Sequence, residues 1–64
     1  MSETGHLFAK LTGELEDLHG LAVEGQAAGQ PKEVLHALAD SLVRGVERIS
    51  RTLLHIRLSI DPDG

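Results

Sequence analysis

The chain has 64 residues, no cysteine, a single aromatic side chain in Phe8 and a formal charge of −4. This composition excludes a disulfide scaffold and a thiolate zinc site, leaves almost no stacking platform for single-stranded nucleic acid, and disfavours nonspecific binding to polyanions. No apolar run approaches the roughly 20 residues that cross a bilayer, and the first ten residues do not resemble a secretory signal. We therefore expect a small, soluble, cytoplasmic protein without a membrane partner.

The first predicted element is a helix over about residues 4–28. Its apolar residues recur at alternating spacings of three and four, which places them on one stripe of a helix. This first seam consists of Phe8, Leu11, Leu15, Leu18 and Ala22. The turn-rich segment GQAAGQP at residues 25–31 follows, and it predicts a turn at about residues 28–31.

The second predicted element is a helix over about residues 31–60. Pro31 suits the first helical position, because its missing N–H would have no partner there. The apolar residues of this helix keep a heptad spacing without a break, which is the most specific signal in the sequence. This second seam consists of Leu35, Ala39, Leu42, Val46, Ile49, Leu53, Ile56 and Ile60. Residues 56–60 also alternate in polarity, so a short strand is an alternative there, and residues 61–64 form a short tail.

A short link between two helices of similar length predicts an all-α fold, an antiparallel two-helix hairpin that forms a single domain over residues 1–64. A turn near residue 30 places positions whose numbers sum to about 60 at the same level. Two helices alone bury too little apolar surface to offset an ordering cost of roughly 1.5 kcal/mol per residue. We therefore expect a homodimeric, coiled-coil-like four-helix bundle, and the main alternative is a bundle completed by another protein.

Two sets of residues stand outside the seams. At the open end of the hairpin, Leu54 and Leu58 point away from the second seam at the level of Leu7 and Phe8. These four residues predict a protein-binding patch, and the alternative is packing across a dimer. A basic stripe on the second helix is either a contact for an anionic partner or a solvated face. It consists of Arg44, Arg48 and Arg51.

No arrangement of residues predicts catalysis. The acidic run at residues 14–17 lacks surroundings that would bury one carboxylate, the serines lack a partnering base, and so small a bundle has no large pocket for a substrate. The four histidines lack the spacing of three or four that puts two metal ligands on one helix face. They are His6, His19, His36 and His55. We therefore expect no enzyme, no bound metal and no organic cofactor.

These features together predict a non-enzymatic protein-binding module that regulates, inhibits or chaperones another protein. In length and architecture the predicted hairpin resembles the plasmid-encoded Rop-type hairpin dimers, and this resemblance implies RNA binding as an alternative. The arginine stripe would then contact the RNA, although the acidic first helix and the net negative charge count against it. A purely structural dimerisation element is a further alternative.

Overall fold

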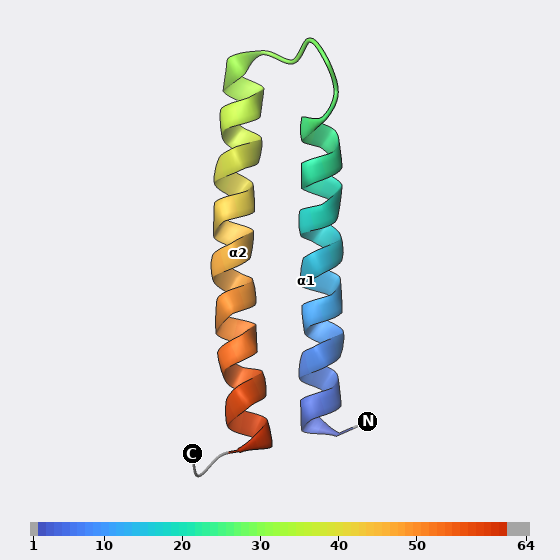
Figure 1. Cartoon of the computed structure of the whole chain (residues 1–64), viewed down its shortest axis with the longest axis vertical. Helices are drawn as coiled ribbons and strands as arrows, with labels where there is room; N and C mark the ends of the chain where they lie inside the picture. The colour runs from blue at the N-terminus through green and yellow to red at the C-terminus, as the bar shows by residue number, and fades with distance from the viewer. Residues whose placement is uncertain (1, 62–64) are drawn as a thin grey trace.

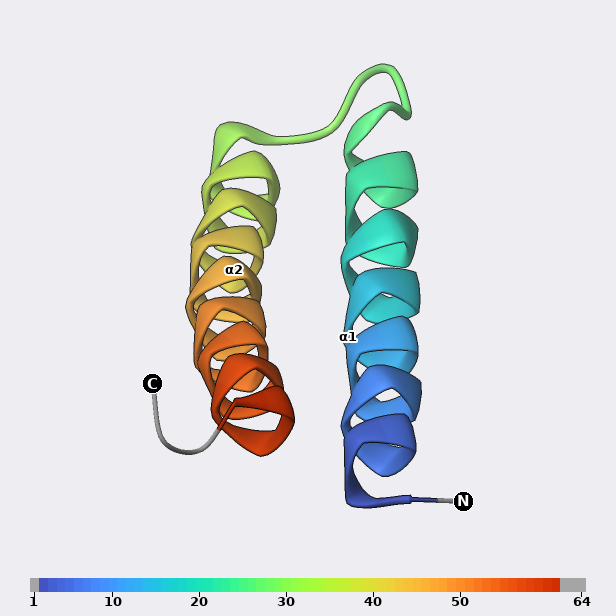
Figure 2. The ribbon, with the colours of Figure 1, turned by 60° about the horizontal axis from the view of Figure 1, so that its bottom comes forward.

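The computed structural model describes residues 2–61, which form two α-helices, α1 (Glu3–Gly25) and α2 (Lys32–Ile60) (Figure 1). The two helices run antiparallel and lie side by side in both views (Figures 1 and 2). The hairpin extends over 50 × 21 × 10 Å, so it is a slab only one helix thick. The predicted all-α, two-helix hairpin is confirmed.

Helix α1 begins where its first turn is capped by a side chain. The Ser2 hydroxyl accepts a hydrogen bond from the Gly5 N–H at 3.0 Å, which satisfies one of the backbone donors that a helix start leaves free. The helix ends at Gly25, three residues before the predicted end at residue 28. Within the connection, Gly29 takes a left-handed φ of 77°, which a residue without a Cβ adopts easily.

The early end of α1 is stabilised by the Gln30 side chain. Its Nε2 donates to the carbonyl oxygens of Glu24 at 2.6 Å and Ala27 at 3.2 Å. Carbonyl groups at a helix end have no partner within the helix, so the amide of Gln30 replaces bonds that a longer helix would have made.

Helix α2 begins one residue later than predicted and ends where predicted. Pro31 is its N-cap in an extended conformation, and the Pro31 carbonyl accepts from the N–H groups of Val34 and Leu35 at 3.1 and 3.2 Å. Residues 56–60 are helical, so the alternative of a terminal strand is wrong. The Asp61 N–H closes the last turn on the Arg57 carbonyl at 3.0 Å. Of the predicted tail, residues 62–64 lie outside the described part of the chain.

The register of the hairpin is fixed by two pairs of residues. The hydroxyls of Thr4 and Ser59 are 2.8 Å apart, and Leu18 lies against Gly45. The numbers of both pairs sum to 63, whereas the sequence predicts a sum of about 60. At this register Gly25 lies level with Leu38, so the first six residues of α2 extend beyond the end of α1 and the connecting segment climbs that distance (Figure 1).

The contact between the helices has little apolar core. Of the described residues, Gly45, Thr52 and Ile56 are buried, and Ile56 is the one large apolar side chain among them, at 4% exposure. The remaining contact residues are partly buried, and they include Thr4, Leu7, Leu11, Glu14, Leu18 and Leu21 of α1 and Leu38, Leu42, Ile49 and Ser59 of α2. Five of these 13 residues are polar or lack a side chain, namely Thr4, Glu14, Gly45, Thr52 and Ser59.

Thr52 is the clearest misfit in this contact. Its side chain is 1% exposed, and its hydroxyl has no hydrogen-bond partner among the described residues. A buried hydroxyl without a partner costs about 1–3 kcal/mol. We expect Thr52→Val, which keeps the shape and removes the hydroxyl, to raise the free energy of unfolding by about 1 kcal/mol. Urea unfolding followed by circular dichroism at one protein concentration measures this change.

The matched control is Thr12→Val on α1. Thr12 is exposed, and its hydroxyl donates to the Phe8 carbonyl at 3.0 Å. This substitution should change stability by less than about 0.5 kcal/mol, as exposed substitutions usually do. A loss of stability in Thr52→Val larger than in Thr12→Val would mean that the Thr52 hydroxyl has a partner in solution.

Gly45 generates a second prediction, because α1 approaches it closely. A Cβ on Gly45 would overlap the Leu18 Cδ2 atom and lie 3.2 Å from its Cγ, whereas a Cβ on Gly20 would meet nothing within 4 Å. Alanine favours a helix over glycine by about 1 kcal/mol, and overpacking costs about 1–3 kcal/mol. We expect Gly20→Ala to stabilise the protein by about 1 kcal/mol and Gly45→Ala to destabilise it by a similar amount. Thermal unfolding of both variants tests this, and equal stabilisation by both would contradict the observed register.

Candidate functional site

A row of apolar residues on α1 is exposed beside the contact with α2. Phe8, Leu15 and Ala22 each follow by one position a residue that faces α2. One residue turns a helix by about 100°, so this row lies on the side of α1 next to the contact. Leu15 is 50% exposed, and Phe8 and Ala22 are exposed as well.

Helix α2 carries an equivalent row. It lies one position after Leu38, Gly45, Thr52 and Ser59, which face α1, and it consists of Ala39, Val46, Leu53 and Ile60. All four of these residues are exposed. The second helix therefore repeats the arrangement of the first, with a mixed contact line and a more apolar line beside it.

The two exposed rows lie on the same face of the hairpin. Two antiparallel helices are related by an approximate two-fold axis perpendicular to the plane that contains them. Rotation about this axis carries the contact line of one helix onto that of the other and keeps every residue on its own face. In both helices, the residue that follows each contact residue therefore lies on the same side of the hairpin. We call this surface the apolar face, and it consists of Phe8, Leu15, Ala22, Ala39, Val46, Leu53 and Ile60.

The opposite face of the hairpin is polar. By the same helical geometry, Asp17 and Glu24 of α1 lie on it together with Arg48 of α2, and Asp17 is the carboxylate closer to the level of Arg48. Arg44 and Arg51 lie farther around α2 on the same side, and all three arginines of the basic stripe are exposed. The Arg44 Nη2 donates to the Ser41 hydroxyl at 3.2 Å. Asp17, Glu24 and the arginines thus lie on the side opposite the apolar face, while exposed apolar residues such as Leu54 and Leu58 belong to neither face.

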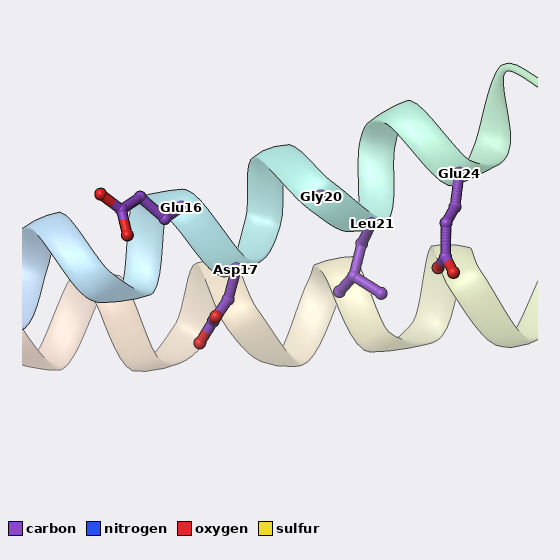
Figure 3. A pocket seen from close by; sticks show the side chains of 5 residues that line it. All are labelled: Glu16, Asp17, Gly20, Leu21 and Glu24. Atoms are coloured by element: carbon purple, nitrogen blue, oxygen red, sulfur yellow. The ribbon is translucent and has the colours of Figure 1, made fainter.

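On the polar side, α1 carries a shallow, open hollow (Figure 3). It is lined by Glu16, Asp17, Gly20, Leu21 and Glu24. Glu16 projects away from α2, whereas Asp17, Leu21 and Glu24 extend in the direction of α2 (Figure 3). Within residues 2–61, no group of three histidine or carboxylate side chains is placed to hold a metal ion.

The predicted protein-binding patch is divided by the structure. Leu7 is partly buried between the helices, and Phe8 belongs to the apolar face. Leu54 and Leu58 each follow by two positions a residue buried against α1, so they lie on the outer side of α2, away from α1. Leu54 and Leu58 line a hollow of about 230 Å³ together with Arg57 and Asp61.

The predicted seams are divided in a similar way. Leu11, Leu18, Leu42, Ile49 and Ile56 lie between the helices, whereas Leu15, Leu35, Val46 and Leu53 are exposed. The centre of each seam therefore points between the neighbouring helix and the apolar face, about 50° away from the helix-to-helix contact. Sequence spacing placed these residues on one stripe of each helix that serves both the hairpin and the expected dimer, but it does not say which of them face the neighbouring helix of the same hairpin.

The surface area of the hairpin agrees with this division. The chain exposes 4820 Å², whereas a compact protein of 6.9 kDa exposes about 4,000 Å². The excess is about 800 Å², which equals the area that one partner contributes to a protein interface of standard size. Exposed area is most unfavourable where it is apolar, so the apolar face is the part of the surface where this excess area matters most.

No family model, curated protein or solved structure matches the chain. Neither of the two described helices has a stretch that is both long and hydrophobic enough to cross a bilayer.

Proposed function

We propose that the chain is a non-enzymatic protein-binding module that works as a homodimer, in which two hairpins bury their apolar faces against each other. The apolar face carries this proposal, because it places a continuous row from each helix on one side of a slab that is one helix thick. A second slab on that side would form a four-helix bundle. The cytoplasmic location that the composition suggests stays a prediction.

The area that such a dimer would bury supports a second copy as the partner. Two separate hairpins expose about 9,600 Å², whereas a compact protein of twice the mass exposes about 6,600 Å². The dimer therefore reaches ordinary compactness if it buries about 3,000 Å², which lies within the range of permanent homodimers. One further hairpin of the same size is enough to cover the face.

The direction of the seams also supports a bundle. In a four-helix bundle each helix has two neighbours, and its most apolar stripe points between them toward the central axis. The seam of α2 has this orientation, because Leu42, Ile49 and Ile56 face α1 while Val46 and Leu53 face outward from the slab. A hairpin that worked alone would place its most apolar stripe against its one neighbouring helix.

The outer side of α2 is the surface we propose for a separate protein partner. Leu54 and Leu58 point away from α1 and do not belong to the apolar face, so dimerisation would leave them exposed. Two leucines four residues apart, with Arg57 and Asp61 beside them, suit the apolar side of an amphipathic helix. Through this contact the dimer would regulate, inhibit or chaperone its partner.

The basic stripe is weaker support for an RNA partner than the exposed apolar residues are for a protein partner. Arg48 shares its face with Asp17 and Glu24, and the chain as a whole has a charge of −4. Carboxylates beside the arginines would repel a phosphate backbone. RNA binding is therefore the less favoured alternative.

Neighbouring leucines on α2 provide a direct test of the dimer. Leu53 belongs to the apolar face and is 44% exposed, whereas Leu54 lies on the outer side of α2 and is 54% exposed. We expect the unmodified chain to sediment at about twice 6.9 kDa. Leu53→Lys should shift it toward monomer and lower its helicity, because each copy would bury a lysine in the interface.

The control in this experiment is Leu54→Lys, which adds the same charge at a more exposed position one residue away. It should leave both the sedimenting mass and the helical signal unchanged. Analytical ultracentrifugation at micromolar concentration, with circular dichroism on the same samples, measures both variants. A folded 6.9 kDa species in the unmodified chain, or equal effects of the two lysines, would refute the dimer.

A pull-down from the native host with the double variant Leu54→Lys, Leu58→Lys tests the outer surface. The unmodified chain should retain a protein that the double variant loses, while both remain dimers by ultracentrifugation. Retention of the chain alone would instead indicate a structural dimerisation element. Retention of RNA, lost steeply as salt is raised, would indicate the RNA-binding alternative, because nucleic-acid affinity falls with salt and apolar docking hardly does.

A further inference from the structure

From the charges around the outer surface of α2 we infer that its partner is a short acidic helix, which crosses α2 obliquely and carries carboxylates on both sides of its apolar residues. The inference rests on the proposed protein-binding function and names the chemistry of the partner. It depends on five exposed residues near the end of α2, which are Arg51, Leu54, Arg57, Leu58 and Asp61.

The centre of this surface is a pair of leucines one helical turn apart. Leu54 is 54% exposed and Leu58 is 49% exposed. Together with Arg57 and Asp61 they line a hollow of about 230 Å³. Pockets that enclose a small molecule have volumes of about 300 Å³ or more, so this hollow is too small and too close to the surface for such a ligand. It suits one or two apolar side chains that project from another helix.

An arginine lies on each flank of Leu54. Three residues turn an α-helix by about 300°, so Arg51, three positions before Leu54, and Arg57, three positions after it, lie about 60° to opposite sides of it. Residues 51, 54 and 57 form one row, which is inclined by about 45° to the helix axis. A partner helix that packs along this row therefore has Leu54 near its centre and an arginine toward each end.

The carboxylates near the leucines lie along the axis of α2 instead. Glu47 and Asp61 are each seven positions from Leu54, about 10.5 Å along the axis, whereas each arginine is about 4.5 Å along it. A separation of about 10 Å exceeds the Debye length at physiological salt, so the arginines dominate the potential around Leu54. Asp61 adjoins Leu58, but it lies at the end of α2, away from the oblique row. Charge therefore favours an acidic helix across α2 over a basic helix along it.

The excess of positive charge is confined to one end of the hairpin. Residues 48–61 carry three arginines and one carboxylate, a net charge of +2, in a chain whose total charge is −4. The remaining residues therefore carry −6. RNA or an anionic bilayer would extend beyond residues 48–61 and would meet this negative remainder, whereas an acidic helix of two or three turns would end before it. The confined charge thus favours a short helix over an extended polyanion.

Two synthetic probes test the charge of the partner. Both are helical peptides about four turns long with the same two central leucines, and these are flanked on both sides by glutamates in one peptide and by lysines in the other. Each probe is titrated into the isotopically labelled full chain, and the amide shifts are followed by NMR. The glutamate probe should shift residues 51–61 and should bind about tenfold more tightly than the lysine probe, because two exposed ion pairs replace two like-charge contacts.

Reversing the two arginines provides the decisive variant. Arg51→Glu with Arg57→Glu should reverse the preference, so that the lysine probe binds more tightly than the glutamate probe. Loss of folding would weaken the binding of both probes and would not reverse their order. The matched control is Lys32→Glu with Arg44→Glu, which changes the net charge by the same amount in the half of α2 nearer the loop. This control should keep the preference of the unmodified chain.

Equal binding of the two probes, tighter binding of the lysine probe to the unmodified chain, or no shift with either probe would overturn the acidic partner. Tighter binding of an RNA duplex or of phosphatidylglycerol vesicles than of the glutamate probe would also overturn it. A sedimenting mass above that of the dimer, which Arg51→Glu with Arg57→Glu removes, would assign the surface to further copies of the chain instead.

The pull-down from the native host separates this inference from the proposed function. A host protein that is lost with Leu54→Lys, Leu58→Lys should also be lost with Arg51→Glu, Arg57→Glu. If the arginine variant retains that protein, the protein-binding surface stands and only its preference for an acidic partner is overturned. If the unmodified chain retains no host protein, the proposed function itself fails.

Discussion

The width of the apolar stripe on each helix is the constraint on which this structure depends. Each helix of the hairpin has one neighbour, but its apolar residues cover more of its circumference than one neighbour can bury. On α2, Ile49 and Ile56 face α1 while Val46 and Leu53 face solvent. Hydrophobic residues exposed in a continuous row are unfavourable in a solitary protein, and the proposed association follows from that imbalance.

The composition of the helix contact makes the imbalance more severe. Where α1 and α2 meet, Leu18 packs closely against Gly45. The Thr52 hydroxyl and one carboxylate oxygen of Glu14 are buried there without a hydrogen-bond partner within residues 2–61. These features limit what the contact contributes to stability. They also favour one register, since a side chain at position 45 would displace Leu18 from its place against α2. The contact between the helices thus defines the shape of the hairpin, and the apolar face carries five of the eleven large hydrophobic side chains that stay exposed among the described residues.

Most of the fold is readable from the sequence, because helix formation and reversal have local causes. Heptad spacing locates both helices, and the glycine-rich segment before Pro31 locates the turn. The end of α1 escapes prediction because it depends on Gln30, whose side chain reaches back six residues to the Glu24 carbonyl. The register escapes prediction because it depends on how far α2 extends beyond the end of α1, which no local sequence pattern determines. The apolar face is predictable from the sequence only in part. Spacing identifies Leu15 and Leu53 as members of an apolar stripe, but their exposure follows from how the two helices are rotated against each other.

The small apolar core between α1 and α2 and the exposed apolar face together link folding to association. Fewer than 70 residues rarely fold without a staple, and this chain has neither a cysteine nor a metal site among its described residues. If the second copy supplies the missing burial, the stability of the fold rises with protein concentration by mass action. The outer surface at Leu54 and Leu58 exists only when α2 is helical, so a partner that binds it would also favour the dimer. Partner binding and dimerisation would then reinforce each other, and a chain too dilute to dimerise would lose its partner surface along with its fold.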